Sequence, residues 1–224
     1  MNIASCIDHT LLKPDSSLAA IEKLCLEAVE FGFAAVCVPP PFVNRVHTLL
    51  APTHIKTATV IGFPFGYSAT EAKIAETVLA IIDGADELDI VINLIALKMG
   101  DWAFLEKEVR MVTEIAHNKG KRIKIIVESG LLTQEEIIHC CSIFAPLGID
   151  FMKTSTGYAE KGASVEAVQL MRNHLPSTVQ IKASGGIRDY TFAKALLEAG
   201  ATRLGCSAGP TIVKGDPAFI TGNY

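Results

Sequence analysis

The sequence has few of the features that mark metal-dependent, disulfide-rich or membrane proteins. Its six cysteines include no C-x2-C pair, and its six histidines include no H-E-x-x-H motif. No uninterrupted apolar run is long enough to span a membrane, and the first residues show no basic segment followed by an apolar one. We therefore expect a cytoplasmic protein with buried, reduced thiols, without a metal and without a membrane partner.

A strong positive charge is also missing. The chain carries 20 Lys and Arg residues against 24 Asp and Glu residues, which gives a formal net charge of −4. Short basic runs such as Lys119–Arg122 flank apolar segments and are typical of a solvated helix end or loop. We therefore expect no nucleic-acid partner, and an anionic substrate must be bound by a local arrangement of groups.

Apolar residues make up 50% of the 224 residues, enough for one substantial α/β core. Short β-branched, apolar runs recur along the chain and are predicted as strands: Ile7–Leu12, Ala34–Val38, Thr57–Ile61, Glu87–Ile92, Ile123–Val127, Ile149–Lys153, Val179–Ala183 and Thr202–Cys206. Amphipathic stretches between them are predicted as helices: Leu18–Phe31, Thr70–Asp83, Trp102–Lys119, Gln134–Phe144, Ser164–His174 and Tyr190–Ala199. Pro39–Leu50 opens with three prolines, which start a helix and exclude a central strand.

Strands that alternate with helices form a parallel sheet. Eight of them in a chain of this length favour a closed (β/α)8 TIM barrel over an open flavodoxin-like sheet, which usually has fewer strands. No Pro/Ser-rich linker divides the chain, so we expect residues 1–224 to form one barrel domain, with Thr221–Tyr224 as a frayed tail. Barrels of this kind carry their chemistry at the carboxyl ends of the strands, where the functional side chains are expected.

Two lysines stand at matching places on neighbouring predicted strands. Lys153 ends the sixth strand and Lys182 lies on the seventh, each followed by a glycine-containing loop. Two buried ammonium groups side by side repel each other, so one is expected to lose its proton and become a nucleophile towards carbonyls. The alternative is that each lysine only pairs with a carboxylate such as Asp89 or Glu128.

The alternation around Asp89 places its carboxylate opposite Leu88 and Ile90, on a face that in a barrel is the interior. An ionised carboxylate there needs a cationic partner, and the lysine pair supplies one. The three groups then form a set able to transfer protons. Alternatively, Asp89 only neutralises Lys182; the residues alone do not separate these two hypotheses.

The loops after the last two strands suggest an anion site. Ser184–Arg188 precedes a helix, and Gly205–Gly209 follows the eighth strand. Glycines let backbone N–H groups approach an anion, so Gly185, Gly186 and Ser207 are candidate phosphate ligands. The alternative is a pair of tight turns that require glycine for their backbone angles.

Several longer motifs make the chain recognisable. They are Ile7–Pro14, Val60–Gly66, Gly84–Asn93, Gly100–Trp102, Lys153–Gly157 and Ile181–Arg188. Over nearly its whole length the chain resembles the deoxyribose-phosphate aldolase family. The strings Lys-Thr-Ser-Thr-Gly and Lys-Ala-Ser-Gly-Gly-Ile-Arg, on consecutive strands, are highly specific together.

The resemblance implies a reversible Schiff-base cleavage of 2-deoxy-D-ribose 5-phosphate to acetaldehyde and D-glyceraldehyde 3-phosphate, without metal or cofactor. It implies that Lys153 forms the Schiff base, that Lys182 lowers the pKa of Lys153, and that Asp89 belongs to the proton relay. The implied phosphate ligands are Gly157, Gly185, Gly186, Arg188 and Ser207. The implied partners are sugar phosphates and aldehydes, and a homodimer or higher homo-oligomer is compatible with the sequence.

One departure concerns the phosphate. Tyr158 follows Gly157 where some members have a lysine, and Lys161 is the residue expected to compensate. Two alternative functions stay open: a related lysine aldolase with another acceptor, and an inactive barrel that only binds phosphosugars.

Overall fold

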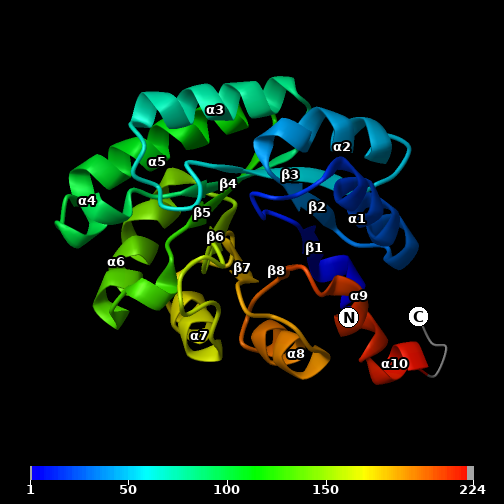
Figure 1. Cartoon of the computed structure of the whole chain (residues 1–224). Helices are drawn as coiled ribbons and strands as arrows, with labels where there is room; N and C mark the ends of the chain where they lie inside the picture. Colours follow the sequence, from blue (N-terminus) through cyan, green and yellow to red (C-terminus); the bar gives the residue numbers. More distant parts are fainter. Residues whose placement is uncertain (1, 221–224) are drawn as a thin grey trace.

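A computed structural model describes residues 2–220. Eight parallel strands close into a barrel in chain order, with the last strand paired to the first, and the helices surround it (Figure 1). The strands are β1 (Ile7–Thr10), β2 (Ala35–Val38), β3 (Lys56–Ile61), β4 (Glu87–Val91), β5 (Arg122–Ile126), β6 (Phe151–Lys153), β7 (Gln180–Ser184) and β8 (Arg203–Cys206). The predicted (β/α)8 barrel is therefore confirmed. The expected tail Thr221–Tyr224 lies outside the described residues.

The helices that the sequence predicts begin and end close to their expected bounds, and further short helices that it does not predict lie at 94–98, 209–214 and 217–220. They are α1 (Leu18–Phe31), α2 (Val43–Leu50), α3 (Thr70–Ile82), α4 (Leu94–Lys98), α5 (Trp102–His117), α6 (Gln134–Phe144), α7 (Val165–His174), α8 (Tyr190–Glu198), α9 (Gly209–Lys214) and α10 (Pro217–Ile220). Ser17 caps α1 by accepting from Ala20 N, and Gly32 ends it with a φ of 67°. Among residues 2–220, no helix combines the length and apolar character needed to cross a membrane.

Two strands are two residues shorter than predicted. The sixth begins at Phe151, because the side chain of Asp150 accepts a hydrogen bond from Ile123 N at 2.9 Å and takes the place of a strand contact. The first strand ends at Thr10, whose hydroxyl donates to Asp8 O at 2.8 Å. At both places a side-chain hydrogen bond to the backbone lies at the end of the strand.

The barrel interior is divided into an apolar part and a charged part. A small apolar cluster lies on the inner face of β2 and β3 and consists of Ala35, Cys37, Ala58 and Val60. The main core lies between the strands and the surrounding helices. The remaining strands carry charged side chains into the interior, so the fold itself prepares a polar site against an apolar wall.

Outside the barrel, a buried ion pair ties two helices to the end of β4. Lys73 of α3 donates to Glu108 of α5 at 2.9 Å and to Val91 O at 2.8 Å, and Glu108 also accepts from Asn93 N at 3.3 Å. Both side chains are almost fully buried. The pair thus fixes the point where the chain leaves the fourth strand.

Replacing Lys73 with Met should lower the free energy of unfolding by about 3–5 kcal/mol, because Glu108 then stays buried without its cation. Urea denaturation measures the loss. Adding Glu108→Gln removes the uncompensated charge and keeps an oxygen for Asn93, so the double variant should recover part of the stability. A single variant as stable as the parent chain would contradict this account of the pair.

Candidate active site

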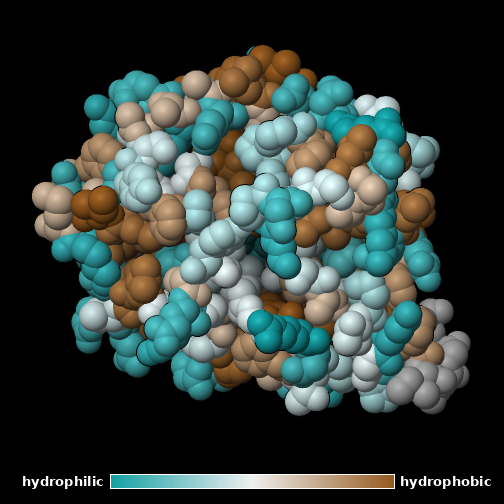
Figure 2. Space-filling view, viewed as in Figure 1, coloured by the Kyte–Doolittle hydropathy of each residue, from teal (hydrophilic) through white to brown (hydrophobic). Residues whose placement is uncertain are grey.

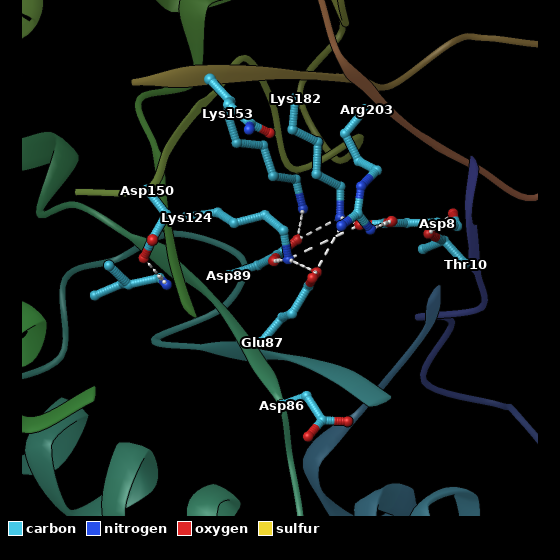
Figure 3. Close-up of polar contacts among 12 residues, drawn as sticks. Asp8, Thr10, Asp86, Glu87, Asp89, Lys124, Asp150, Lys153, Lys182 and Arg203 are labelled. Carbon is cyan, nitrogen blue, oxygen red and sulfur yellow. Dashed lines mark hydrogen bonds and ion pairs between the residues drawn. The ribbon is translucent and has the colours of Figure 1, made fainter. Parts of the chain in front are cut away.

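A cluster of charged side chains fills the centre of the barrel (Figure 3). All of its members point inward from strands and are at least nine-tenths buried. The cations are Lys124, Lys153, Lys182 and Arg203, and the carboxylates are Asp8, Glu87 and Asp89. We call these seven residues the buried charge cluster.

Asp89 lies at the middle of the cluster. Its Oδ2 accepts from the Nζ atoms of Lys153 and Lys182, at 2.7 Å each, and its Oδ1 accepts from Lys124 at 2.8 Å. Figure 3 shows the three lysine side chains converging on this carboxylate. The structure thus places Asp89 in the interior, as the alternation predicts, and between both candidate lysines.

Further contacts, made by Asp8 and Glu87, hold this arrangement in place. Asp8 contacts both Arg203 and Lys182, and Glu87 contacts Lys124 at 2.6 Å and Arg203 at 2.9 Å. Every carboxylate of the buried charge cluster therefore has at least two cationic partners. Shared partners of this kind hold the lysine side chains in defined positions.

Three members of the site were not predicted from the sequence: Lys124, Glu87 and Arg203. The sequence does contain a pattern that places Lys124 in the barrel interior. Lys124 alternates with Ile123 and Ile125, as Asp89 alternates with its own neighbours. Which carboxylate each cation contacts depends on how the strands align around the barrel, and the chain order alone does not show that alignment.

The charges of the cluster do not balance, since four cations meet three carboxylates. The free-energy cost of the excess buried positive charge is removed most easily if one lysine loses its proton. Burial lowers the pKa of Lys153; Asp89 opposes this shift, and Lys182 adds to it. By contrast, Asp8 and Asp89 overcome the effect of burial on Lys182 and raise its pKa. Lys153 is thus the lysine of this pair whose pKa is lowered, which makes it the candidate for a neutral amine.

The cause of the shift differs in part from the sequence-based hypothesis. Repulsion between paired lysines contributes, and the two residues are direct partners across β6 and β7. Burial is nevertheless the larger cause for Lys153. For Asp89, the neighbouring charges outweigh burial. Burial favours its neutral form, but Lys124 and the two paired lysines hold the pKa of its carboxyl well below the usual range.

An apolar wall faces the charged half of the interior. Cys37, Ala58 and Val60 form it, with Leu12 and Phe63 packed against them. Burial raises the pKa of Cys37 to about 11, so its thiol stays protonated at neutral pH. The wall therefore offers a small apolar surface beside the charged groups and not a second nucleophile.

Gly205 is a further residue that the sequence analysis did not assign to the site's interior. A Cβ atom there would lie 3.0 Å from Lys182 Cε and 2.9 Å from Ser184 Cβ. Only a residue without a side chain leaves the room that the lysine needs to reach the cluster.

The loops after β1, β6, β7 and β8 enclose a pocket of about 500 Å³, which we call the loop pocket. All five predicted phosphate ligands line it: Gly157, Gly185, Gly186, Arg188 and Ser207. Gly185 and Gly186 have φ values of 89° and 81°, so they are also the tight turns of the alternative interpretation. Figure 2 shows a hollow near the middle of the molecular face, bordered by hydrophilic side chains.

The structure does not place Lys161 in the loop pocket. Its side chain is exposed, and its backbone packs against Gly130. Tyr158 does line the pocket; its hydroxyl donates to Leu12 O at 2.8 Å, and its ring meets Phe63 edge-on at 5.3 Å between centroids. The expected compensation by Lys161 is therefore not what the structure shows.

Glu128, the other carboxylate considered for the lysines, has a different partner. It accepts hydrogen bonds from the backbone N–H and the hydroxyl of Thr156. Burial raises the pKa of its carboxyl. Its hydrogen bonds hold the loop after β6 at the edge of the loop pocket and involve neither candidate lysine.

Comparisons with known proteins point to one family of enzymes. Residues 3–215 match the model of the DeoC/LacD family of aldolases. The chain is 47% identical over 215 residues to the deoxyribose-phosphate aldolase of Thermoanaerobacter sp. (strain X514), and 48% identical over 217 residues to that of Thermococcus gammatolerans. Each alignment covers 96% of both chains.

Solved structures give the same result. A putative deoxyribose-phosphate aldolase from Coccidioides immitis superposes with a TM-score of 0.91 at 41% identity, over 95% of this chain and 85% of that one. The deoxyribose phosphate aldolase from Aeropyrum pernix, described as a tetramer, superposes with a TM-score of 0.89 at 30% identity, over 98% and 91%. The chain therefore belongs to the DeoC/LacD family of aldolases.

Proposed function

We propose that this aldolase cleaves 2-deoxy-D-ribose 5-phosphate reversibly to acetaldehyde and D-glyceraldehyde 3-phosphate, through a Schiff base on Lys153. The observation that carries the proposal is the pairing of one buried amine of lowered pKa with an ionised carboxylate 2.7 Å away. The loop pocket beside the same end of the barrel supplies room for a phosphate group. The name of the deoxyribose-phosphate aldolases to which the chain is 47% and 48% identical supports the same substrate.

The first step joins the sugar to the enzyme. The neutral Nζ of Lys153 attacks the C1 aldehyde of the open-chain sugar, and loss of one water from the adduct gives a protonated imine. Lys182, whose pKa is raised, stays protonated and donates the proton that the leaving hydroxyl needs. Asp89 stays ionised at 2.7 Å from the imine nitrogen and stabilises its positive charge.

The second step breaks the C2–C3 bond. The C3 hydroxyl loses its proton, C3 becomes the carbonyl of glyceraldehyde 3-phosphate, and the bonding electron pair moves to the imine as an enamine. Lys182 gave up its proton in the first step, so its neutral amine, whose pKa is raised, accepts this proton through a water and later returns it to C2. The enamine carbon C2 is then protonated, and water hydrolyses the resulting imine to release acetaldehyde and regenerate the amine.

The apolar wall and the loop pocket orient the substrate. Cys37 and its apolar neighbours suit the two-carbon fragment, which carries no polar group beyond the reacting carbonyl. The glycine backbone of the loop pocket suits the phosphate at the other end of the sugar. Holding both ends contributes through position and not through chemistry.

Borohydride trapping tests the proposal. Reduction in the presence of acetaldehyde should convert the imine to a stable secondary amine, and mass spectrometry of peptides should find an ethyl group on Lys153. Acetaldehyde without borohydride, and borohydride without acetaldehyde, serve as controls. The proposal fails if no adduct maps to Lys153.

The two alternatives give different results in the same assays. An aldolase with another acceptor would show the adduct but prefer a different aldehyde or ketone in a substrate panel. An inactive phosphosugar-binding barrel would be stabilised by sugar phosphate and show no trapped imine.

A further inference from the structure

The loop pocket contains a cation that the proposed mechanism has not used. Its charged lining residues are Lys13, from the loop after β1, and Arg188, from the loop after β7. Among residues 2–220, no Asp or Glu lines this pocket. Two cations without a carboxylate give the pocket a local positive charge in a chain whose net charge is −4.

Neither cation is neutralised by the protein. Within residues 2–220, the Lys13 ammonium and the Arg188 guanidinium form no ion pair and no side-chain hydrogen bond. In contrast, the cations of the buried charge cluster each contact a carboxylate. Charged donors left free at a pocket are available for an anionic ligand.

The backbone that carries Lys13 is held in place from both sides. On one side, the Tyr158 hydroxyl donates to Leu12 O at 2.8 Å. On the other, Ser16 donates to Lys13 O from its hydroxyl at 2.6 Å and from its backbone N–H at 3.2 Å. The tyrosine N–H in turn donates to Thr156 Oγ1 at 3.0 Å, so the contact links the loops after β1 and β6.

We propose that Lys13 binds the substrate phosphate together with Arg188, and that Tyr158 is a positioning residue that holds the Lys13 loop at the pocket. The inference rests on the proposed function, because it assumes that a sugar phosphate occupies the loop pocket. Lys13 thereby determines preference for phosphorylated over phosphate-free substrate. The tyrosine after Gly157 contributes no charge itself and acts through the residue that it anchors.

Kinetics with two substrates test the role of Lys13. For Lys13→Met, the ratio of kcat/KM for 2-deoxy-D-ribose 5-phosphate to that for 2-deoxy-D-ribose should fall about tenfold or more, mainly through KM, because a charge-assisted contact is lost. Lys13→Arg should keep most of the ratio. Lys161→Met, which removes a nearby exposed lysine outside the pocket, is the matched control and should leave the ratio unchanged.

Tyr158→Phe tests the positioning role. It removes the hydroxyl that donates to Leu12 O and keeps the ring against Phe63. The substrate ratio should fall by less than for Lys13→Met, with the change in KM and not in kcat. A purely structural role would lower kcat for both substrates and leave the substrate ratio unchanged, and that result would overturn the assignment of Tyr158.

Binding of inorganic phosphate separates this inference from the proposed function. Phosphate should raise the Tm of the parent protein, and of Lys161→Met, by more than that of Lys13→Met. An unchanged substrate ratio and an unchanged phosphate effect in Lys13→Met would overturn the inference, even if borohydride traps Lys153. If borohydride traps no imine but phosphate still raises the Tm in a way that depends on Lys13, the aldolase proposal alone is contradicted.

Discussion

Replacing Lys153 with Met should lower turnover by at least about 10³-fold, because no other amine of the buried charge cluster is set to attack a carbonyl. Lys124 and Lys182 both have raised pKa values, since their carboxylate partners outweigh burial. They remain protonated and cannot take over the reaction. Release of glyceraldehyde 3-phosphate from the sugar phosphate, followed with a coupled assay, measures the loss.

The same variant should stay folded. Without Lys153 the buried charge cluster has three cations and three carboxylates, and methionine fills most of the space of the lysine stem. Thermal unfolding checks this, and Lys194→Met serves as the control because Lys194 is an exposed lysine in a weak pair with Glu198. Substantial turnover by Lys153→Met, or an imine trapped on another residue, would refute the assignment.

Local patterns predicted the elements that carry the site. The alternation around Asp89 placed it inside the barrel, and the predicted sixth and seventh strands placed Lys153 and Lys182 at matching positions on neighbouring strands. The structure shows all three in contact. These predictions succeeded because strand alternation and βα order are local properties of a chain, and a closed barrel brings consecutive strands together.

The pairing of charges was less predictable. Arg203 contacts Asp8 and Glu87, which lie 195 and 116 residues away in the chain. Contacts at such separations depend on the register of every strand between them. Loop positions were harder still to predict. Lys161 was expected near the phosphate, but Lys13 lines the pocket, because the backbone path of each loop decides which lysine faces it.

The charge balance of the buried charge cluster makes a further prediction about Lys182. If Lys182 is replaced with Met, three cations and three carboxylates remain while Lys153 is protonated, so Lys153 no longer gains from losing its proton. Since Lys182 contributes to lowering the pKa of Lys153, that pKa should rise. At neutral pH less of the amine is then neutral, and turnover should fall by about 10²-fold or more.

The pH profile of kcat/KM distinguishes this effect from a loss of folding. Its acid limb follows deprotonation of Lys153, so the limb should move to higher pH in Lys182→Met, and activity should recover in part as the pH is raised. Asp89→Asn is the matched contrast. Asp89 raises the pKa of Lys153, so removing its charge should move the acid limb to lower pH while also reducing kcat. Limbs that stay in place, or that move in the same direction in both variants, would show that the charge balance does not control the nucleophile.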